Sequence, residues 1–291
     1  MPTASGARTE HSLPGQNVPQ GTGRRRGPSQ FHFIDIEVGA GGDSMKVTVI
    51  GSSDAFGSGG RLHTCFHVAA GAQEFLIDCG ATVLTGLDRE GLAANRIGTI
   101  FITHLHGDHF GGLVWWLIHA NHVTGRTEPL VVTGPAGLEA RFWTAAEALY
   151  PNCRSTPRRF DLTFVAYETG KPLDVNGIRV TPFEVSHPSG ATPYALRIEA
   201  GGKTVSFSGD TEWVETLVPA AAGADLFICE CFAFERDARY HLNWRTIERE
   251  LPRLTSRRVL LTHMGPDMLA NLGAVTNPRI TWAKDGMVLD I

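Results

Sequence analysis

The sequence predicts an α+β protein, an αββα sandwich in which two β-sheets pack face to face and helices cover their outer faces. From Met45 onward, short apolar runs typical of strands alternate with segments of helical periodicity, and this arrangement occurs twice along the chain. Hydrophobic residues make up 42% of the chain and charged residues 19%, so a sizeable core is available. Two sheets with outer helices would bury both kinds of segment.

The first half of this pattern consists mainly of strands separated by turns rich in Gly and Ser. A helix is expected at Gly112–His122, where apolar residues occur most of the way round. A second helix, Gly137–Leu149, stops before Pro151. The strands expected here are Lys46–Ile50, Thr64–Val68, Glu74–Ile77, Thr99–Thr103 and Leu130–Thr133.

The second half repeats the arrangement of strands followed by helices and further strands. Helices are expected at Glu212–Ala222 and Trp244–Leu251. The strands expected here are Leu162–Tyr167, Ile178–Val185, Tyr194–Ala200, Thr204–Ser208, Asp225–Cys229, Val259–Leu261 and Met287–Leu289.

The N-terminal segment, residues 1–44, differs in composition from the rest. It begins with a stretch rich in Gly, Pro, Ser, Thr and Arg that offers little to bury, so we expect a disordered extension before a domain at 45–291. The apolar segment Phe31–Val38 is too short and too charged for the core of a signal peptide. An alternative interpretation is that Met45 is the natural start.

The overall composition excludes several classes of protein. The net charge of −4 gives no global attraction to nucleic acid. No apolar stretch reaches the ~18–20 residues of a membrane span, so we expect no membrane contact. The five cysteines are odd in number and show no repeated spacing, which favours reduced thiols and a cytoplasmic location.

The strongest chemical signal is the segment Thr103-His104-Leu105-His106-Gly107-Asp108-His109, directly after an expected buried strand. On an extended segment the two alternating histidines point the same way, and Gly107 lets the chain turn. Neutral imidazole and carboxylate are the ligands that zinc, manganese and iron accept. A polar loop that holds three histidines by chance is the less favoured interpretation.

Three further residues of metal-ligand type, His187, Asp210 and His263, each lie on a loop just past an expected strand. Each such residue alone is more often a capping or core polar residue. Because loops at one edge of a sandwich converge, we expect the three to join the first cluster. Together they give a set of seven: His104, His106, Asp108, His109, His187, Asp210 and His263.

This pattern resembles the metallo-β-lactamase fold superfamily, through His104-x-His106-x-Asp108-His109, Ser208-Gly209-Asp210-Thr211 and Leu261-Thr262-His263-Met264. The similarity runs from about Met45 to Ile291. It implies two mixed β-sheets and a site for two divalent metal ions, with Zn²⁺ expected and Mn²⁺ or Fe²⁺ as alternatives.

The resemblance also implies roles for the seven residues. His104, His106 and His187 would bind the first ion, Asp108, His109 and His263 the second, and Asp210 would bridge both. Two-metal hydrolases lower the pKa of a bound water and clamp a substrate oxygen. Asp108 is therefore expected to be catalytic as well as a ligand.

A further histidine, His241 in Tyr240-His241-Leu242-Asn243-Trp244, favours one branch of the superfamily. It is similar to the extra histidine of the ribonuclease Z and phosphodiesterase branch, where it would donate a proton to the leaving oxygen or stabilise the charged phosphorane-like state. The alternative is a surface residue at a helix start, with Asn243 as the cap. The compact stretch from Val132 to Arg179 holds no basic, glycine-rich arm, which argues against tRNA binding.

Three functions therefore stay open. The first is hydrolysis of a phosphodiester, such as a small phosphodiester, a cyclic nucleotide or an RNA end, by a metal-bound hydroxide. The second is hydrolysis of a carbonyl substrate, such as a lactone, a lactam or a thioester, which the ions would polarise. The third is a non-catalytic metal-binding accessory protein on the same fold. A small-molecule substrate is expected, and a homodimer is an option that relatives suggest.

Overall fold

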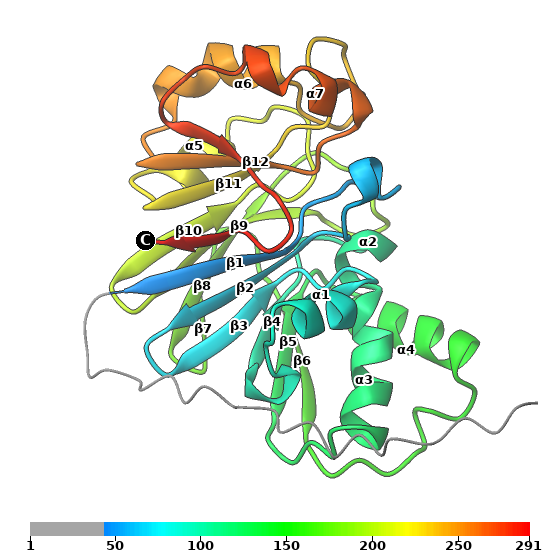
Figure 1. Ribbon diagram of the computed structural model, residues 1–291. Helices are drawn as coiled ribbons and strands as arrows, with labels where there is room; N and C mark the ends of the chain where they lie inside the picture. Colours follow the sequence, from blue (N-terminus) through cyan, green and yellow to red (C-terminus); the bar gives the residue numbers. More distant parts are fainter. Residues whose placement is uncertain (1–43) are drawn as a thin grey trace, which may run out of the picture. The chain divides into compact units, whose positions relative to one another are not determined.

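A computed structural model describes residues 44–291 and shows two β-sheets of seven strands each, packed face to face (Figure 1). Helices cover the outer faces, which confirms the predicted αββα sandwich. The expected N-terminal extension, residues 1–44, lies outside the described residues apart from Ser44. Within the described residues no helix is long and apolar enough to cross a membrane.

The first sheet is mixed. Its strand pairs are antiparallel from β14 to β3 and parallel from β3 to β6. Val47 in β1 lies opposite Val68 and Leu289 in its two neighbours, so apolar side chains line up across the strands. In spatial order the strands are β14 (Val288–Asp290), β1 (Met45–Gly51), β2 (Cys65–Ala70), β3 (Gln73–Ile77), β4 (Thr99–Phe101), β5 (Leu130–Gly134) and β6 (Leu162–Ala166).

The second sheet repeats this arrangement. Its pairs are parallel from β13 to β10 and antiparallel from β10 to β7. Parallel strands need crossover connections, and these supply the outer helices. In spatial order the strands are β13 (Ile280–Trp282), β12 (Arg258–Thr262), β11 (Leu226–Glu230), β10 (Lys203–Phe207), β9 (Tyr194–Ala200), β8 (Ile178–Glu184) and β7 (Leu173–Val175).

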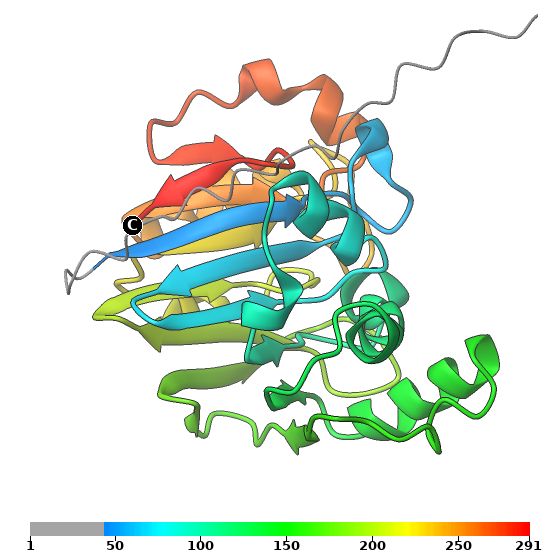
Figure 2. The same cartoon turned by 60° about the horizontal axis from the view of Figure 1, so that its bottom comes forward.

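The helices form two groups, one on each sheet, as the view in Figure 2 also shows. The first group comprises α1 (Val83–Arg89), the short α2 (Gly107–Phe110), α3 (Gly112–His122) and α4 (Leu138–Leu149). The second comprises α5 (Leu217–Ala221), α6 (Trp244–Glu250) and α7 (Pro266–Ala270). Single 3₁₀ turns lie at η1 (Ser58–Gly60), η2 (Ala94–Arg96), η3 (Leu251–Arg253) and η4 (Leu272–Ala274).

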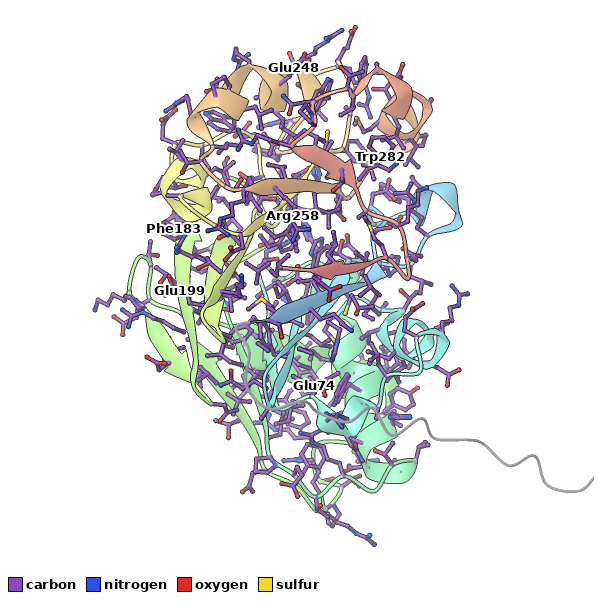
Figure 3. All side chains as sticks on the ribbon, turned by 60° about the vertical axis from the view of Figure 1, so that its left-hand side comes forward. Glu74, Phe183, Glu199, Glu248, Arg258 and Trp282 are labelled. Atoms are coloured by element: carbon purple, nitrogen blue, oxygen red, sulfur yellow. The ribbon has the colours of Figure 1, made fainter. Side chains whose placement is uncertain are left out.

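The main core lies between the two sheets. Phe66 on β2 and Phe207 on β10 are fully buried, and their rings meet edge to face at 5.3 Å. Burial of each Phe side chain stabilises the folded state by about 1.5–3 kcal/mol. Figure 3, in which Glu74 marks the first sheet and Phe183 and Trp282 mark the second, shows side chains filling the space between the sheets. Two further apolar clusters lie on the outer faces of the sheets, one beneath each group of helices.

One predicted helix is much shorter than expected. The sequence predicted a helix over Glu212–Ala222, but only Leu217–Ala221 is helical. The reason is that Glu212 is tied to the end of β8: its N–H donates to the Ser186 carbonyl at 3.3 Å, and its carboxylate accepts from the Ser186 hydroxyl at 2.6 Å. These bonds keep the chain extended next to Asp210. The sequence also missed five short helices and strands, α1, α2, α7, β7 and β13.

Candidate metal centre

The loops after four strands converge at one edge of the sandwich. β10 and β12 run parallel through β11, so their carboxyl ends lie at the same edge. Asp210 follows β10 and His263 follows β12, while His187 follows β8. The cluster from His104 to His109 follows β4 of the first sheet. The structure thus brings all seven predicted residues together, in two groups whose ligand atoms lie within 4.8 Å of one another, with Asp210 in the second group.

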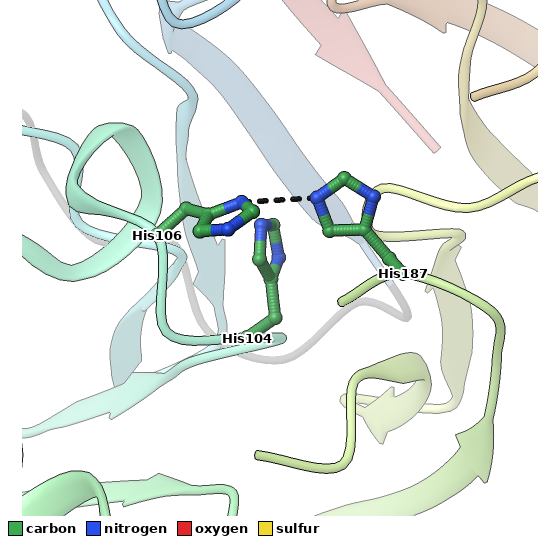
Figure 4. A group of neighbouring side chains, drawn as sticks. All are labelled: His104, His106 and His187. Atoms are coloured by element: carbon green, nitrogen blue, oxygen red, sulfur yellow. Dashed lines mark hydrogen bonds between the residues drawn. The ribbon is translucent and has the colours of Figure 1, made fainter. Parts of the chain in front are cut away.

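The first group consists of the three imidazoles of His104, His106 and His187 (Figure 4). Their ring centroids lie 4.8–5.0 Å apart, so the rings surround one point. The closest nitrogens, His106 Nδ1 and His187 Nε2, are 2.9 Å apart. On the far side of its ring, His187 Nδ1 donates to the Tyr240 carbonyl at 3.0 Å, which leaves Nε2 as the nitrogen that can bind an ion.

The second group consists of two carboxylates and two imidazoles, all buried. His109 Nε2 lies 3.2 Å from Asp108 Oδ2 and 3.3 Å from Asp210 Oδ1. His263 Nε2 lies 3.3 Å from Asp108 Oδ2 and 3.2 Å from Asp210 Oδ2. Each nitrogen therefore faces both carboxylates at nearly the same distance.

Asp210 lies between the two groups. Its Oδ2 is 3.8 Å from His104 Nε2 and 3.9 Å from His187 Nε2, in addition to its contacts with the second group. Gly209, directly before it, has φ +58°, and a Cβ there would lie 2.7 Å from the Tyr194 carbonyl oxygen. Only glycine fits this position, and it delivers Asp210 to the centre.

The donor atoms fit divalent metal ions. His104 Nε2, His109 Nε2 and Asp210 Oδ1 are buried and make no hydrogen bond within the described residues. Buried polar atoms are rarely left without a partner, and an ion would supply one. The spacing of 3.2–3.3 Å in the second group is close to the roughly 3.3–3.4 Å that separates nitrogen and oxygen ligands around a tetrahedral zinc ion.

The pKa values of the histidines are shifted in opposite directions in the two groups. Burial lowers the pKa of His104, His106 and His187, the last to about 4. Burial acts in the same direction on His109 and His263, but the nearby carboxylates outweigh it. They raise the pKa of His263 to about 9 and that of His109 well above its usual value.

Asp78 supports the second group, and we did not predict it from the sequence. It is fully buried, and its Oδ2 lies 2.6 Å from His109 Nδ1. It also accepts from the Thr103 N–H and hydroxyl, each at 2.8 Å. Burial raises the pKa of Asp78, and His109 opposes that rise. The sequence held a signal for Asp78, because this residue directly follows the expected strand Glu74–Ile77.

Glu230 was also missed, and it defines the setting of His241. Glu230 is fully buried at the end of β11, and its carboxylate lies 3.1 Å from His241 Nδ1. Burial disfavours the charged form of His241, yet the bond to Glu230 raises its pKa above the usual value. A ring nitrogen of His241 also lies within 4.8 Å of ligand atoms of His187 and Asp210. His241 is therefore part of the centre and not a surface residue at a helix start.

Residues near His241 and elsewhere around the centre have structural roles. Asn243 caps α6, since its side-chain oxygen accepts from the Thr246 N–H at 2.8 Å. Outside the centre, Trp116 and Trp115 are neighbours on α3. Trp116 is buried, whereas Trp115 is 37% exposed. Cys229 and Cys231 are buried free thiols in the core.

The comparison with known families identifies the chain. The model of the family described as anti-Pycsar protein Apyc1 matches residues 45–286. The chain belongs to this family. This member of the Apyc1 family is 25% identical to the probable metallo-hydrolase YhfI of Bacillus subtilis, over 84% of the chain and 99% of YhfI. It is 24% identical to ribonuclease Z of Agathobacter rectalis, over 77% of the chain and 89% of that enzyme.

Solved structures show the same fold as this Apyc1-family chain. YhfI of Bacillus subtilis has a TM-score of 0.69 at 23% identity, covering 85% of this chain and 99% of YhfI. The short form of human tRNase Z has a TM-score of 0.67 at 23% identity, covering 84% of this chain and 98% of that enzyme. The homologues are metallo-β-lactamase fold hydrolases, which confirms the resemblance seen in the sequence. The chain is thus a metallo-hydrolase homologue with a histidine and aspartate cluster suited to divalent metal ions.

Proposed function

We propose that this chain is a phosphodiesterase with two divalent metal ions, most simply Zn²⁺, that cleaves a small phosphodiester, a cyclic nucleotide or an RNA end. The observation that carries the proposal is the pairing of His241 with buried Glu230 beside the seven-residue cluster. Phosphodiester cleavage gains from protonation of the leaving oxygen, so a proton donor at this place favours that reaction over the opening of a thioester, whose thiolate leaves without a proton.

The positions of the seven clustered residues suggest which of them would bind each ion. His104, His106 and His187 would hold one ion, Asp108, His109 and His263 the other, and Asp210 would contact both. When bound, the ions would polarise a phosphoryl oxygen and make a water molecule acidic. The negative charge of Asp210 offsets the repulsion between two cations.

Asp108 would add a hydrogen-bond acceptor to the reaction. Burial favours its neutral form, but His109 and His263 outweigh burial and hold the pKa of this carboxyl far below its usual value. Asp108 therefore stays ionised throughout the usual pH range and cannot donate a proton. Its role is to accept a hydrogen bond from the attacking water and orient it.

His241 would be the proton donor. Its Nδ1 is occupied by Glu230, so Nε2 is the ring atom left for the substrate. The bond to Glu230 raises the pKa of His241, which favours its imidazolium form. Nε2–H can then donate to the oxygen that leaves phosphorus, while Glu230 keeps the ring in place and stabilises its charge.

A small substrate fits the fold better than tRNA. Between Val132 and Arg179 the chain passes through β5, α4, β6, β7 and β8 without a further inserted element. Ribonuclease Z is among the relatives by name, so an RNA end remains within the proposed class. The homodimer and the cytoplasmic location stay predictions.

The test is His241→Ala in metal-loaded protein, with a 3′,5′-cyclic nucleotide as substrate, because its ribose oxygen is a poor leaving group that needs a proton. We expect kcat to fall by ~10²–10⁴, the usual contribution of a general acid. Metal content should not change, because the other seven residues are intact. His122→Ala, an exposed histidine at the end of α3, is the matched control and should keep full activity.

Hydrolysis of a lactone or thioester panel separates the alternatives. If the wild-type protein opens a lactone or thioester and leaves every phosphodiester intact, the carbonyl hydrolase replaces our proposal. If it binds stoichiometric metal and hydrolyses nothing on either panel, the accessory protein replaces it.

A further inference from the structure

A cavity of about 390 Å³ lies at the C-terminal end of α3, away from the metal centre. α3 begins at Gly112, just after the segment that carries Asp108 and His109, and its eleven residues span roughly 16 Å. The walls of the cavity come from the last turn of α3, the turn that follows it and the loop after α4. We call this cavity the Arg126 pocket. Small-molecule sites span about 300–1,000 Å³, so it has the size of a ligand site.

Arg126 places a positive charge in the wall of this pocket. The residue is only 2% exposed, and its guanidinium donates to the carbonyls of Glu128, Ile97 and Pro129 at 2.7–2.9 Å. All of its hydrogen bonds within residues 44–291 go to carbonyls, so no carboxylate contacts it there. A buried charge without an opposite charge beside it is costly, and an anion in the pocket would offset that cost.

Arg159 and Asn121 supply donors that are not engaged elsewhere. Both line the pocket, and neither side chain makes a hydrogen bond or an ion pair in the part of the chain that the structure describes. Glu128 and Asp161, the acidic residues closest in sequence to the two arginines, are exposed, and neither lines the pocket. Guanidinium N–H groups bind phosphate oxygens through charge-assisted hydrogen bonds, so the lining suits an oxyanion.

The end of α3 does not oppose an anion as strongly as a bare helix end would. The C-terminal end of a helix carries a partial negative charge, which lies on carbonyls without partners. Here the chain turns back over it, and the His119 carbonyl accepts from the N–H groups of Val123 and Thr124 at 2.9 and 3.0 Å. The Ala120 carbonyl accepts from the Arg126 N–H at 2.9 Å. Because these carbonyls are satisfied, the arginine charges dominate the pocket.

Two more arginines continue the positive surface along the loop after α4. The guanidinium carbons of Arg154 and Arg158 lie 5.4 and 5.3 Å from the centre of the Trp143 ring. Neither arginine forms an ion pair within residues 44–291, and neither lines the Arg126 pocket. They therefore add to the attraction of an anion without contacting it in the pocket.

We propose that the Arg126 pocket binds a phosphate group, held by the Arg159 guanidinium and the Asn121 amide beside the charge of Arg126. The phosphate can belong to a free phosphate compound or to the backbone of an RNA strand, since both present the same oxyanion. The site is separate from the metal centre, and the inference does not depend on the proposed reaction.

Equilibrium dialysis of the metal-loaded protein with radiolabelled inorganic phosphate tests this site. Because the metal centre can also bind phosphate, the difference between wild-type protein and Arg159→Gln reports the pocket. Arg159→Gln should weaken this additional phosphate at least about tenfold, the loss of one hydrogen bond to a charged group. Arg154→Gln, an exposed arginine of the same loop, is the matched control and should bind phosphate as the wild-type protein does. An unchanged melting temperature without phosphate checks that Arg159→Gln is folded.

A short single-stranded RNA distinguishes the two sources of phosphate. If RNA is the source, it should displace the labelled phosphate that Arg159 holds, and Arg154→Gln should weaken the RNA because a strand reaches the neighbouring arginines. If a free phosphate compound is the source, the RNA should leave that labelled phosphate in place. Equal phosphate binding by folded Arg159→Gln and wild-type protein, in number and in affinity, would overturn the proposal.

Discussion

The two halves of the metal centre use the same imidazole side chain under opposite electrostatic conditions. The first half, His104, His106 and His187, holds no carboxylate of its own, and Asp210 lies 3.8–3.9 Å from two of its rings. In the second half, His109 and His263 each lie 3.2–3.3 Å from both Asp108 and Asp210. Burial is nearly complete for four of these five rings, so carboxylates and not burial make the difference.

This difference predicts how each half takes up an ion. The pKa of His187 is about 4, so this ring is neutral at pH 7 and ready to coordinate. The pKa of His263 is about 9, so without metal this ring is protonated at pH 7, and an ion must displace the proton. The first half can therefore bind a cation without losing a proton. The second half must release protons when a cation binds.

The largest expected effect comes from removing the charge that joins the halves. Asp210→Asn keeps the shape of the side chain but should empty both sites during dialysis. We expect activity to fall by more than about 10³-fold, beyond the 10–100-fold typical of residues that only support ligands. Metal analysis and hydrolysis rates check it. Asp161→Asn, an exposed aspartate, is the control, and an Asp210→Asn variant that retains two ions would contradict the bridging role.

The second effect is the pH dependence of metal affinity. Because the pKa of His263 is about 9 and that of His109 is also raised, both rings must lose protons when an ion binds. Affinity of the second half should therefore rise with pH, about tenfold per unit for each proton released, from about pH 6.5 to 8.5. The first half should change little above pH 6, since His187 is already neutral there.

Calorimetry in buffers of different ionisation enthalpy measures this proton release directly. Two classes of site with different proton counts are expected. Equal proton release at both sites, or none at either, would show that the two halves do not differ as their pKa values indicate.

The sequence predicted the architecture well because hydrophobic periodicity determines which segments are buried. Gly112–His122 and Tyr194–Ala200 have the bounds expected of them. The helix expected over Glu212–Ala222 failed because the hydrogen bonds of Glu212 to Ser186 come from a segment distant in the chain. Such a tertiary contact overrides a local pattern.

Tertiary contacts also limited what the sequence could predict about the metal centre. The seven ligand-type residues could be found from spacing because each follows a strand. Of the partners that tune them, Asp78 follows a strand and Glu230 is the last residue of one. Their roles depend on contacts with His109 and His241 that only the folded chain shows. The sign of each pKa shift likewise depends on distances between residues that are far apart in sequence.

The third effect concerns Asp78, which contacts His109 in the second half of the metal centre. Asp78→Asn removes the charge behind His109 and makes that ring a weaker base. We expect the affinity for the second ion to fall by about 10–100-fold, with a smaller change at the first. Thr103→Val is the informative companion, because the Thr103 hydroxyl contacts both Asp78 and His104 Nδ1, the latter at 3.0 Å. If Thr103→Val weakens the second ion as much as Asp78→Asn does, Asp78 acts through general packing and not through His109.

The smallest expected effect concerns the backbone of the second half. His263 has φ +56°, which is costly for a residue other than glycine, and its N–H donates to the Ser52 carbonyl at 3.1 Å. Asp285 holds Ser52 in turn, since its Oδ1 accepts from the Ser52 N–H at 3.0 Å and the Ser52 hydroxyl at 2.7 Å. Asp285→Ala should therefore weaken the second ion by up to about tenfold and leave the first unchanged, at the lower end of the range for supporting residues. Asp290→Ala, an exposed aspartate on β14, is the control. Titration with Co²⁺, followed by its absorption, measures both sites, and equal weakening of the two ions would mean that Asp285 stabilises the fold and does not position His263.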